Sequence, residues 1–89
     1  FHTAIYRLSG NSAIEETVAA QWPHLKRSMG VVLDNPHERL LVWHEHAAIA
    51  RFILAGDARQ AEAAAHDHTS RAGTETAKRL IQLTATEAA

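Results

Sequence analysis

The chain has 89 residues, with nine basic, ten acidic and seven histidine residues and a formal net charge of −1 at neutral pH. This length allows one small domain, and the balanced charge excludes the basic surface of a nucleic-acid-binding module. The sequence has no cysteine, which excludes disulfides and thiolate metal sites, and no apolar run long enough to cross a bilayer. Eighteen of its hydrophobic residues are alanine. We therefore expect a thin core, completed by a partner subunit or a further segment.

The hydrophobic spacing predicts an all-α fold. Phe1, Ile5 and Leu8 recur at helical spacing, and the Ser-Gly-Asn stretch at residues 9–11 ends this first helix. A helix of two turns is marginal in water, so we expect it to be part of a longer helix. A second helix is predicted over residues 12–33, and Pro23 should kink it, because proline removes one backbone donor.

Two further helices follow from clear start and stop signals. Asn35 followed by Pro36 predicts an N-cap and a first helical position, which open a helix that runs to about residue 55. Gly56 ends it and Asp57 starts the fourth helix. Gly73 is a point at which this last helix could be interrupted. Residues 85–89 are expected to form a flexible tail.

The histidines carry the only evident chemistry, since the sequence has no phosphate loop, no nucleophile motif and no paired carboxylates in an apolar stretch. Two His-x-His pairs occur, and residues two apart on a helix diverge by about 200°, so each pair offers one inward ligand. By helical phase the inward members are His46 and His68, whereas His44 and His66 lie on mixed or solvated faces. Together with His2, three helices then each contribute one imidazole, which suits zinc or a similar divalent ion.

Two other interpretations remain open at this point. A single histidine on an apolar stripe is more often a core residue than a ligand, so the chain could be a plain helical dimerisation module without metal. It could also be a metal-dependent hydrolase, which would need a general base beside the metal-bound water. Glu45 and Asp67 adjoin the candidate ligands, but neighbouring residues on a helix diverge by about 100°, so neither is well aimed.

The order and spacing of several short motifs resemble the ligand-binding FCD domain of GntR-type transcriptional regulators of the FadR subfamily. Most specific are Glu-His-Ala-Ala-Ile at residues 45–49, Ala-Gly-Asp-Ala at 55–58 and the following histidines at 66 and 68. Residues 1–5 and Ser-Gly-Asn at 9–11 also fit the family pattern. The likeness covers residues 1 to about 70 and corresponds to the C-terminal part of that domain.

This resemblance implies an antiparallel helical bundle over residues 1–84 that binds a divalent metal, with zinc first and nickel or manganese as alternatives. The family's ligands are one Asp and three His; the His positions match His2, His46 and His68, and the Asp would lie four residues before His2, outside this chain. The resemblance also implies a small carboxylate effector, with Arg27 as an anion contact, and a homodimer. DNA would be bound only through a winged-helix domain absent from this chain. It further implies a cytoplasmic regulator with no membrane partner and no enzymatic activity.

Overall fold

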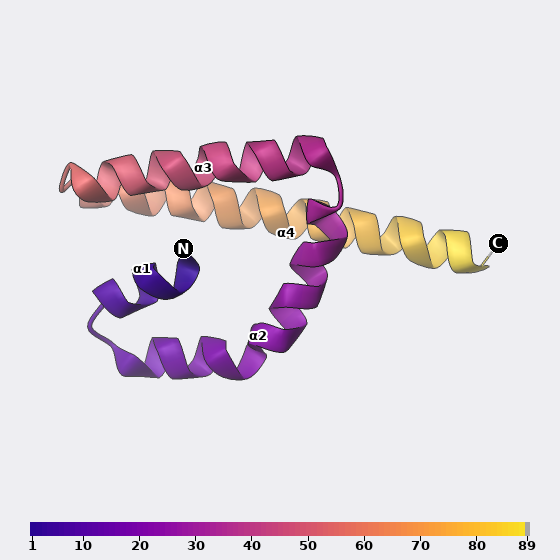
Figure 1. The fold of residues 1–89 in the computed structure, drawn as a ribbon, viewed down its shortest axis with the longest axis horizontal. Helices are drawn as coiled ribbons and strands as arrows, with labels where there is room; N and C mark the ends of the chain where they lie inside the picture. Colours follow the sequence, from indigo (N-terminus) through magenta and orange to yellow (C-terminus); the bar gives the residue numbers. More distant parts are fainter. Residues whose placement is uncertain (89) are drawn as a thin grey trace.

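The computed structural model describes residues 1–88, and these form four helices and no strand. The helices are α1 (His2–Leu8), α2 (Ser12–Leu33), α3 (Pro36–Leu54) and α4 (Ala58–Ala88), as Figure 1 shows. The predicted all-α class is confirmed, and apart from the C-terminal end of α4 the helix boundaries lie within a residue or so of those expected from the sequence. No described helix combines the length and the apolarity that a membrane crossing requires.

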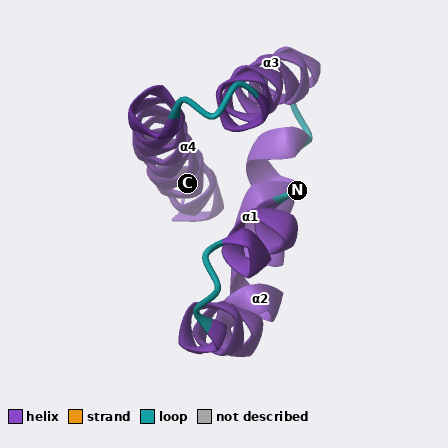
Figure 2. Ribbon diagram, turned by 90° about the vertical axis from the view of Figure 1, so that its left-hand side faces the viewer, coloured by secondary structure: helices purple, strands orange, loops and turns teal. Residues whose placement is uncertain are grey.

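The four helices are arranged around an antiparallel hairpin of α3 and α4, which lie side by side along the whole of α3 (Figure 1). Seen end-on, α1 lies between this hairpin and the first half of α2 (Figure 2). The second half of α2 rises to the start of α3 and contacts both α3 and α4. Among the described residues, the backbone of α1 comes close only to α2. Its contacts with the hairpin are therefore made by side chains.

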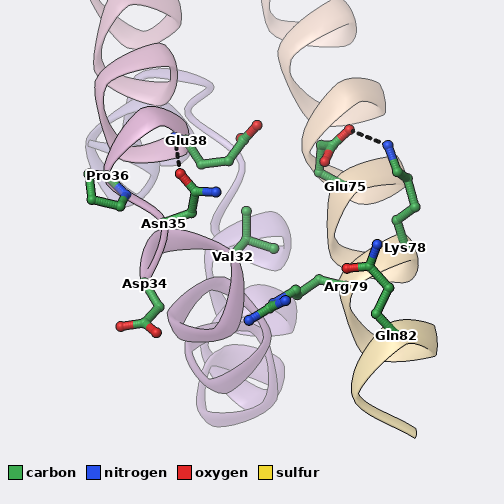
Figure 3. A pocket seen from close by; sticks show the side chains of 9 residues that line it. All are labelled: Val32, Asp34, Asn35, Pro36, Glu38, Glu75, Lys78, Arg79 and Gln82. Atoms are coloured by element: carbon green, nitrogen blue, oxygen red, sulfur yellow. Dashed lines mark hydrogen bonds and ion pairs between the residues drawn. The ribbon is translucent and has the colours of Figure 1, made fainter. Parts of the chain in front are cut away.

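Local capping interactions fix the helix boundaries. The Asn11 side chain accepts a hydrogen bond from the Ala13 amide at 3.1 Å, and Asn35 accepts from the amides of the next helix, including that of Glu38 (Figure 3). Asp57 Oδ1 accepts from the Gln60 amide at 3.1 Å, which caps α4. Gly10 and Gly56 have φ of 69° and 72°, the left-handed conformation that glycine adopts at helix ends.

Two long helices differ in how they respond to helix-breaking residues. Helix α2 bends part way along (Figure 1), and Pro23 lies inside it, as the missing amide donor predicts. Helix α4 runs through Gly73 without interruption, because a single glycine costs a helix only about 1 kcal/mol. Helix α4 also continues through residues 85–88, which we expected to form a flexible tail, and residue 89 lies outside the described residues.

The core of the described chain is small and unusual in composition. Its buried side chains are Val32, Ile49, His46 and His68. Several large apolar side chains remain exposed, among them Trp43 and Leu54. The radius of gyration is 14.8 Å, against about 12 Å for a compact domain of this length. The thin core expected from the alanine content is thus observed, and histidine supplies half of its buried residues.

Candidate metal centre

Three helices bring one histidine each to a single point. His2 comes from α1, His46 from α3 and His68 from α4, and one ring nitrogen of each lies within 4.8 Å of the others. His46 and His68 are 9% and 6% exposed, and His2 is half-buried. Their neighbours His44 and His66 are exposed. The structure therefore separates the two members of each His-x-His pair in the way that helical phase predicts.

The spacing of the donor atoms fits a tetrahedral ion. Nε2 of His46 lies 3.1 Å from Nε2 of His68. Two nitrogens bound to one zinc ion at 2.0–2.1 Å in tetrahedral geometry lie about 3.3–3.4 Å apart. The other ring nitrogen of His46, Nδ1, is buried and has no hydrogen-bond partner among the described residues. The three imidazoles could thus hold a divalent ion.

The environment keeps His2 and His46 neutral, which is the form in which imidazole binds a metal. Burial, and then the neighbouring His68, lower the pKa of His46 to about 4. The same two causes lower the pKa of His2 below its ordinary value. At neutral pH both rings therefore carry a free nitrogen lone pair. Neutral imidazole suits zinc, nickel and related divalent ions.

Two aromatic rings, those of Phe1 and Trp43, pack against the His46 ring. The Phe1 ring stacks on the His46 ring with centroids 4.0 Å apart and planes at 10°. The Trp43 ring meets it edge-on at 5.3 Å. These contacts fix the orientation of the imidazole and exclude water from one face. They also explain how a polar side chain becomes one of the most buried in the chain.

A carboxylate and a guanidinium lie directly behind His68, and the sequence did not reveal them. Nδ1 of His68 lies 3.0 Å from Oε1 of Glu45. Arg71 donates to both oxygens of Glu45, at 2.7 and 2.6 Å, and to Glu38 at 2.9 Å. Hydrogen bonds from Arg71 hold the pKa of the Glu45 carboxyl below its usual range. One signal was available: Glu38 and Glu45 are seven residues apart and so share a helix face.

A cavity of about 450 Å³ opens beside His2 and His68, between α1, α2 and α4. Its walls are mainly apolar, and hydroxyl groups add the polar part; the lining side chains besides the two histidines include Tyr6, Trp22, Leu25, Ser28, Met29, Thr69, Thr76 and Leu80. This volume and this lining are typical of small-molecule sites. Among the described residues, no Lys or Arg lines it. The positive charge needed to bind an anion in this cavity would therefore have to come from another source. A metal ion held by the adjoining imidazole cluster could supply it.

Arg27, the expected effector contact, lies outside the lining of this cavity. Its side chain is on the exposed surface of α2, where the guanidinium contacts the His24 ring. A second cavity, of about 430 Å³, lies between the α2–α3 junction and α4 (Figure 3). Its lining carries charges of both signs, including a Glu75–Lys78 pair, and contains no histidine. Of the two cavities, the one beside His2 and His68 combines apolar walls with candidate metal ligands.

The described chain is thus an arrangement of four helices in which three histidines converge. Comparison with known families identifies it: the family model described as the FCD domain matches residues 1–71. The chain belongs to the FCD family, the regulatory ligand-binding domains of GntR-type regulators, which confirms the resemblance read from its motifs. Searches of curated proteins and of solved structures gave no match.

Proposed function

We propose that the chain is the effector-sensing and dimerisation module of a GntR-type regulator, that it binds one divalent metal ion through His2, His46 and His68, and that it performs no catalysis. The observation that carries this proposal is the convergence of three imidazole nitrogens from three helices within 4.8 Å. Membership of a regulatory ligand-binding family supports the sensing role. Zinc is the first candidate, with nickel and manganese as alternatives, since ring nitrogens suit all three.

The proposed effector is a small carboxylate that occupies the 450 Å³ cavity and meets the metal at its edge. Three protein ligands leave a coordination position free on a four-coordinate ion. His2 and His68 belong both to the imidazole cluster and to the cavity wall, so a carboxylate could reach the ion from the cavity. Arg27 remains a predicted anion contact, and it would have to leave His24 to reach the cavity.

Binding would regulate by linkage. The cavity is bounded by α1, α2 and α4, so an effector that contacts all three favours one arrangement of these helices over others. The free energy by which the effector shifts the parent regulator between two helix arrangements equals the difference between its binding free energies for those arrangements. We propose a homodimer as the unit in which this difference is expressed, in line with the small core and the exposed apolar side chains.

A metal-dependent hydrolase is the weaker candidate. Such an enzyme needs a base within reach of a metal-bound water. The nearest carboxylate, Glu45, is engaged by Nδ1 of His68 and by Arg71, so its oxygens are directed at other partners. This arrangement favours a structural role for Glu45 and a sensing role for the site.

Calorimetric titration tests the proposal. Metal-free protein should bind one zinc ion per chain, and small carboxylates should then bind only to the metal-loaded protein. The His66→Ala variant, altered at an exposed ring, is the matched control and should behave like the unaltered chain. Absence of stoichiometric binding for zinc, nickel and manganese alike would refute the metal site. Equal carboxylate binding with and without metal would refute the proposed effector position.

A further inference from the structure

We infer that Glu45, held by Arg71, is the residue that positions His68 as a metal ligand by fixing which of its ring nitrogens carries the proton. This inference rests on the proposed metal site and adds to it two residues that lie outside the set of ligands. It assigns a function to the side-chain cluster Glu38–Glu45–Arg71–His68, which links α3 to α4.

The proton assignment follows from the chemistry of the partners. Arg71 donates to both oxygens of Glu45, the two-nitrogen contact that a guanidinium makes with an ionised carboxylate, and an ionised carboxylate only accepts hydrogen bonds. Nδ1 of His68, 3.0 Å from Oε1 of Glu45, must therefore donate its proton. In a neutral imidazole the other nitrogen then carries the lone pair. That nitrogen is Nε2, the atom that faces Nε2 of His46 at 3.1 Å.

Arg71 makes this arrangement rigid. Its guanidinium donates to both oxygens of Glu45 through two nitrogens, which fixes the plane of the carboxylate as well as its position. A third donor, Nη1, reaches Glu38 one heptad earlier on α3. The side chains of Glu38, Glu45 and Arg71 are 14%, 21% and 28% exposed. Water therefore competes only weakly with these ion pairs.

The contacts from Arg71 to Glu45 and from Glu45 to His68 place a lone pair on Nε2 of His68 in the metal-free protein. A histidine ligand whose second nitrogen donates to a carboxylate is fixed in tautomer and ring orientation, and it is a stronger base toward the metal. With the His68 lone pair at Nε2, the contact with His46 requires a proton on Nε2 of His46. Nδ1 of His46 is then a buried acceptor for which the described residues supply no donor. Metal binding would displace this proton to Nδ1 of His46.

The first test uses metal-free protein and nitrogen NMR of the imidazoles, at a pH well above the ordinary histidine pKa of about 6.5. His68 should carry its proton on Nδ1 in the unaltered chain and in Glu38→Ala, which loses a contact with Arg71 but none with His68. In Glu45→Ala the population of the Nε2–H tautomer should rise. A proton on Nε2 of His68 in the unaltered chain would overturn the inference, as would an equal shift in Glu38→Ala.

The second test is zinc affinity measured with a competing chelator. Glu45→Ala should weaken zinc binding about 10- to 100-fold, the range for losing a carboxylate partner of a ligating histidine. Arg71→Lys should weaken it less, since lysine keeps the charge but loses the two-nitrogen contact. Glu38→Ala should change it least. If Glu45→Ala does not fold by circular dichroism, Glu45→Gln replaces it, because the amide keeps the shape and removes the charge.

The two readouts separate failure of the inference from failure of the proposed function. If the unaltered chain binds no metal, the proposed function fails, and the tautomer measurement still decides whether Glu45 orients His68. If the chain binds metal, and Glu45→Ala and Glu38→Ala weaken zinc binding equally, the cluster only holds α3 and α4 together. In that case the metal site stands and the positioning role is refuted.

Discussion

The α3–α4 hairpin and the α1–α2 pair are held together by different means. Within the hairpin, Arg71 joins two carboxylates of α3, and two buried histidines face each other across the interface. Between α1 and α2 the corresponding ion pair is Arg7–Glu15, at 2.7 Å, whose side chains are 70% and 36% exposed. Exposed pairs of this kind contribute about 0–1 kcal/mol. The hairpin is thus the better-fixed half of the molecule.

This difference bears on how the proposed metal site is assembled. Two of its ligands belong to the hairpin, and the third belongs to α1, which meets the hairpin through the side chains of Phe1 and His2. The hairpin therefore places two ring nitrogens close together, whereas the position of His2 depends on where α1 lies. A bound ion would tie the less constrained half of the chain to the more constrained one.

The sharpest test of this comparison is loss of a hairpin ligand. His46→Ala and His68→Ala should each lower zinc affinity by more than about 100-fold, beyond the range for loss of a residue that only supports a ligand. His44→Ala and His66→Ala, each two residues away and exposed, should bind zinc like the unaltered chain. Calorimetric titration measures all four. Similar losses in the two groups would contradict the assignment by helical phase.

Limited trypsin digestion tests the link to α1. Arg7 lies in the last turn of α1 with an exposed side chain, so cleavage after it reports on opening of this helix. Zinc at 100 times its dissociation constant should slow that cleavage by up to about 100-fold if α1 must detach first. Cleavage after Lys78 and Arg79, which lie in the C-terminal half of α4, is the internal control. In His2→Ala the protection at Arg7 should disappear; protection that persists would place the third ligand elsewhere.

Association should depend on the outer face of the hairpin. Leu40, Trp43 and Leu54 recur at helical spacing on α3 and are 60%, 65% and 87% exposed. If the dimer buries this face, Leu40→Glu should raise its dissociation constant about 10- to 100-fold, since burying one leucine contributes about 1.5–3 kcal/mol. Sedimentation equilibrium measures this. Ile81→Glu, on α4 beyond the end of α3, is the control. A dimer disrupted by Ile81→Glu alone would move the interface to α4.

The smallest expected effect is a pH dependence of stability in the metal-free protein. The pKa of His46 is about 4 in the folded chain and about 6.5 when unfolded. Between these values the unfolded chain binds a proton that the folded chain does not, so stability falls as pH decreases from 6.5 toward 4. His2, with a pKa shifted in the same direction, adds to this slope, whereas the Glu45 charge reduces the shift of His46.

Thermal melting between pH 7 and pH 5 follows this loss, at about 4–8 °C for each kcal/mol in a domain of this size. The His46→Gln variant should show a shallower decrease, because it cannot take up that proton. His66→Ala, altered at an exposed ring, should keep the decrease of the unaltered chain. A melting temperature that stays constant over this range would contradict the neutral, desolvated state of His46.

The fold was predictable because its signals are local. Caps such as Asn35 and Asp57 and the left-handed Gly56 act within a few residues of their own position, so they can be recognised without knowing the tertiary structure. The inward direction of His46 and His68 follows likewise from helical phase and is confirmed by their burial. That they bind a metal remains a prediction.

The support behind His68 was not predictable, because it depends on the register between two helices. Glu45 is 23 residues from His68, and its role requires that α3 and α4 align so that Arg71 meets both Glu38 and Glu45. Helical phase predicted that the Glu45 side chain diverges from that of His46. It did not predict that this divergence brings Glu45 to Nδ1 of His68, on the opposite side of that ring from His46. Sequence spacing within one helix shows that Glu38 and Glu45 share a face, but it does not show which residue of another helix they meet.

The bend of α2 has a consequence for the shape of the cavity. Trp22 and Leu25, on either side of Pro23, both line the cavity beside His2 and His68, although the proline itself is not part of the wall. On a straight helix, residues three apart form a straight row of side chains. On a bent helix that row is curved, so it forms a concave or convex wall. The bend at Pro23 thereby contributes to the curvature of this wall, and with it to the shape of the cavity between α1, α2 and α4.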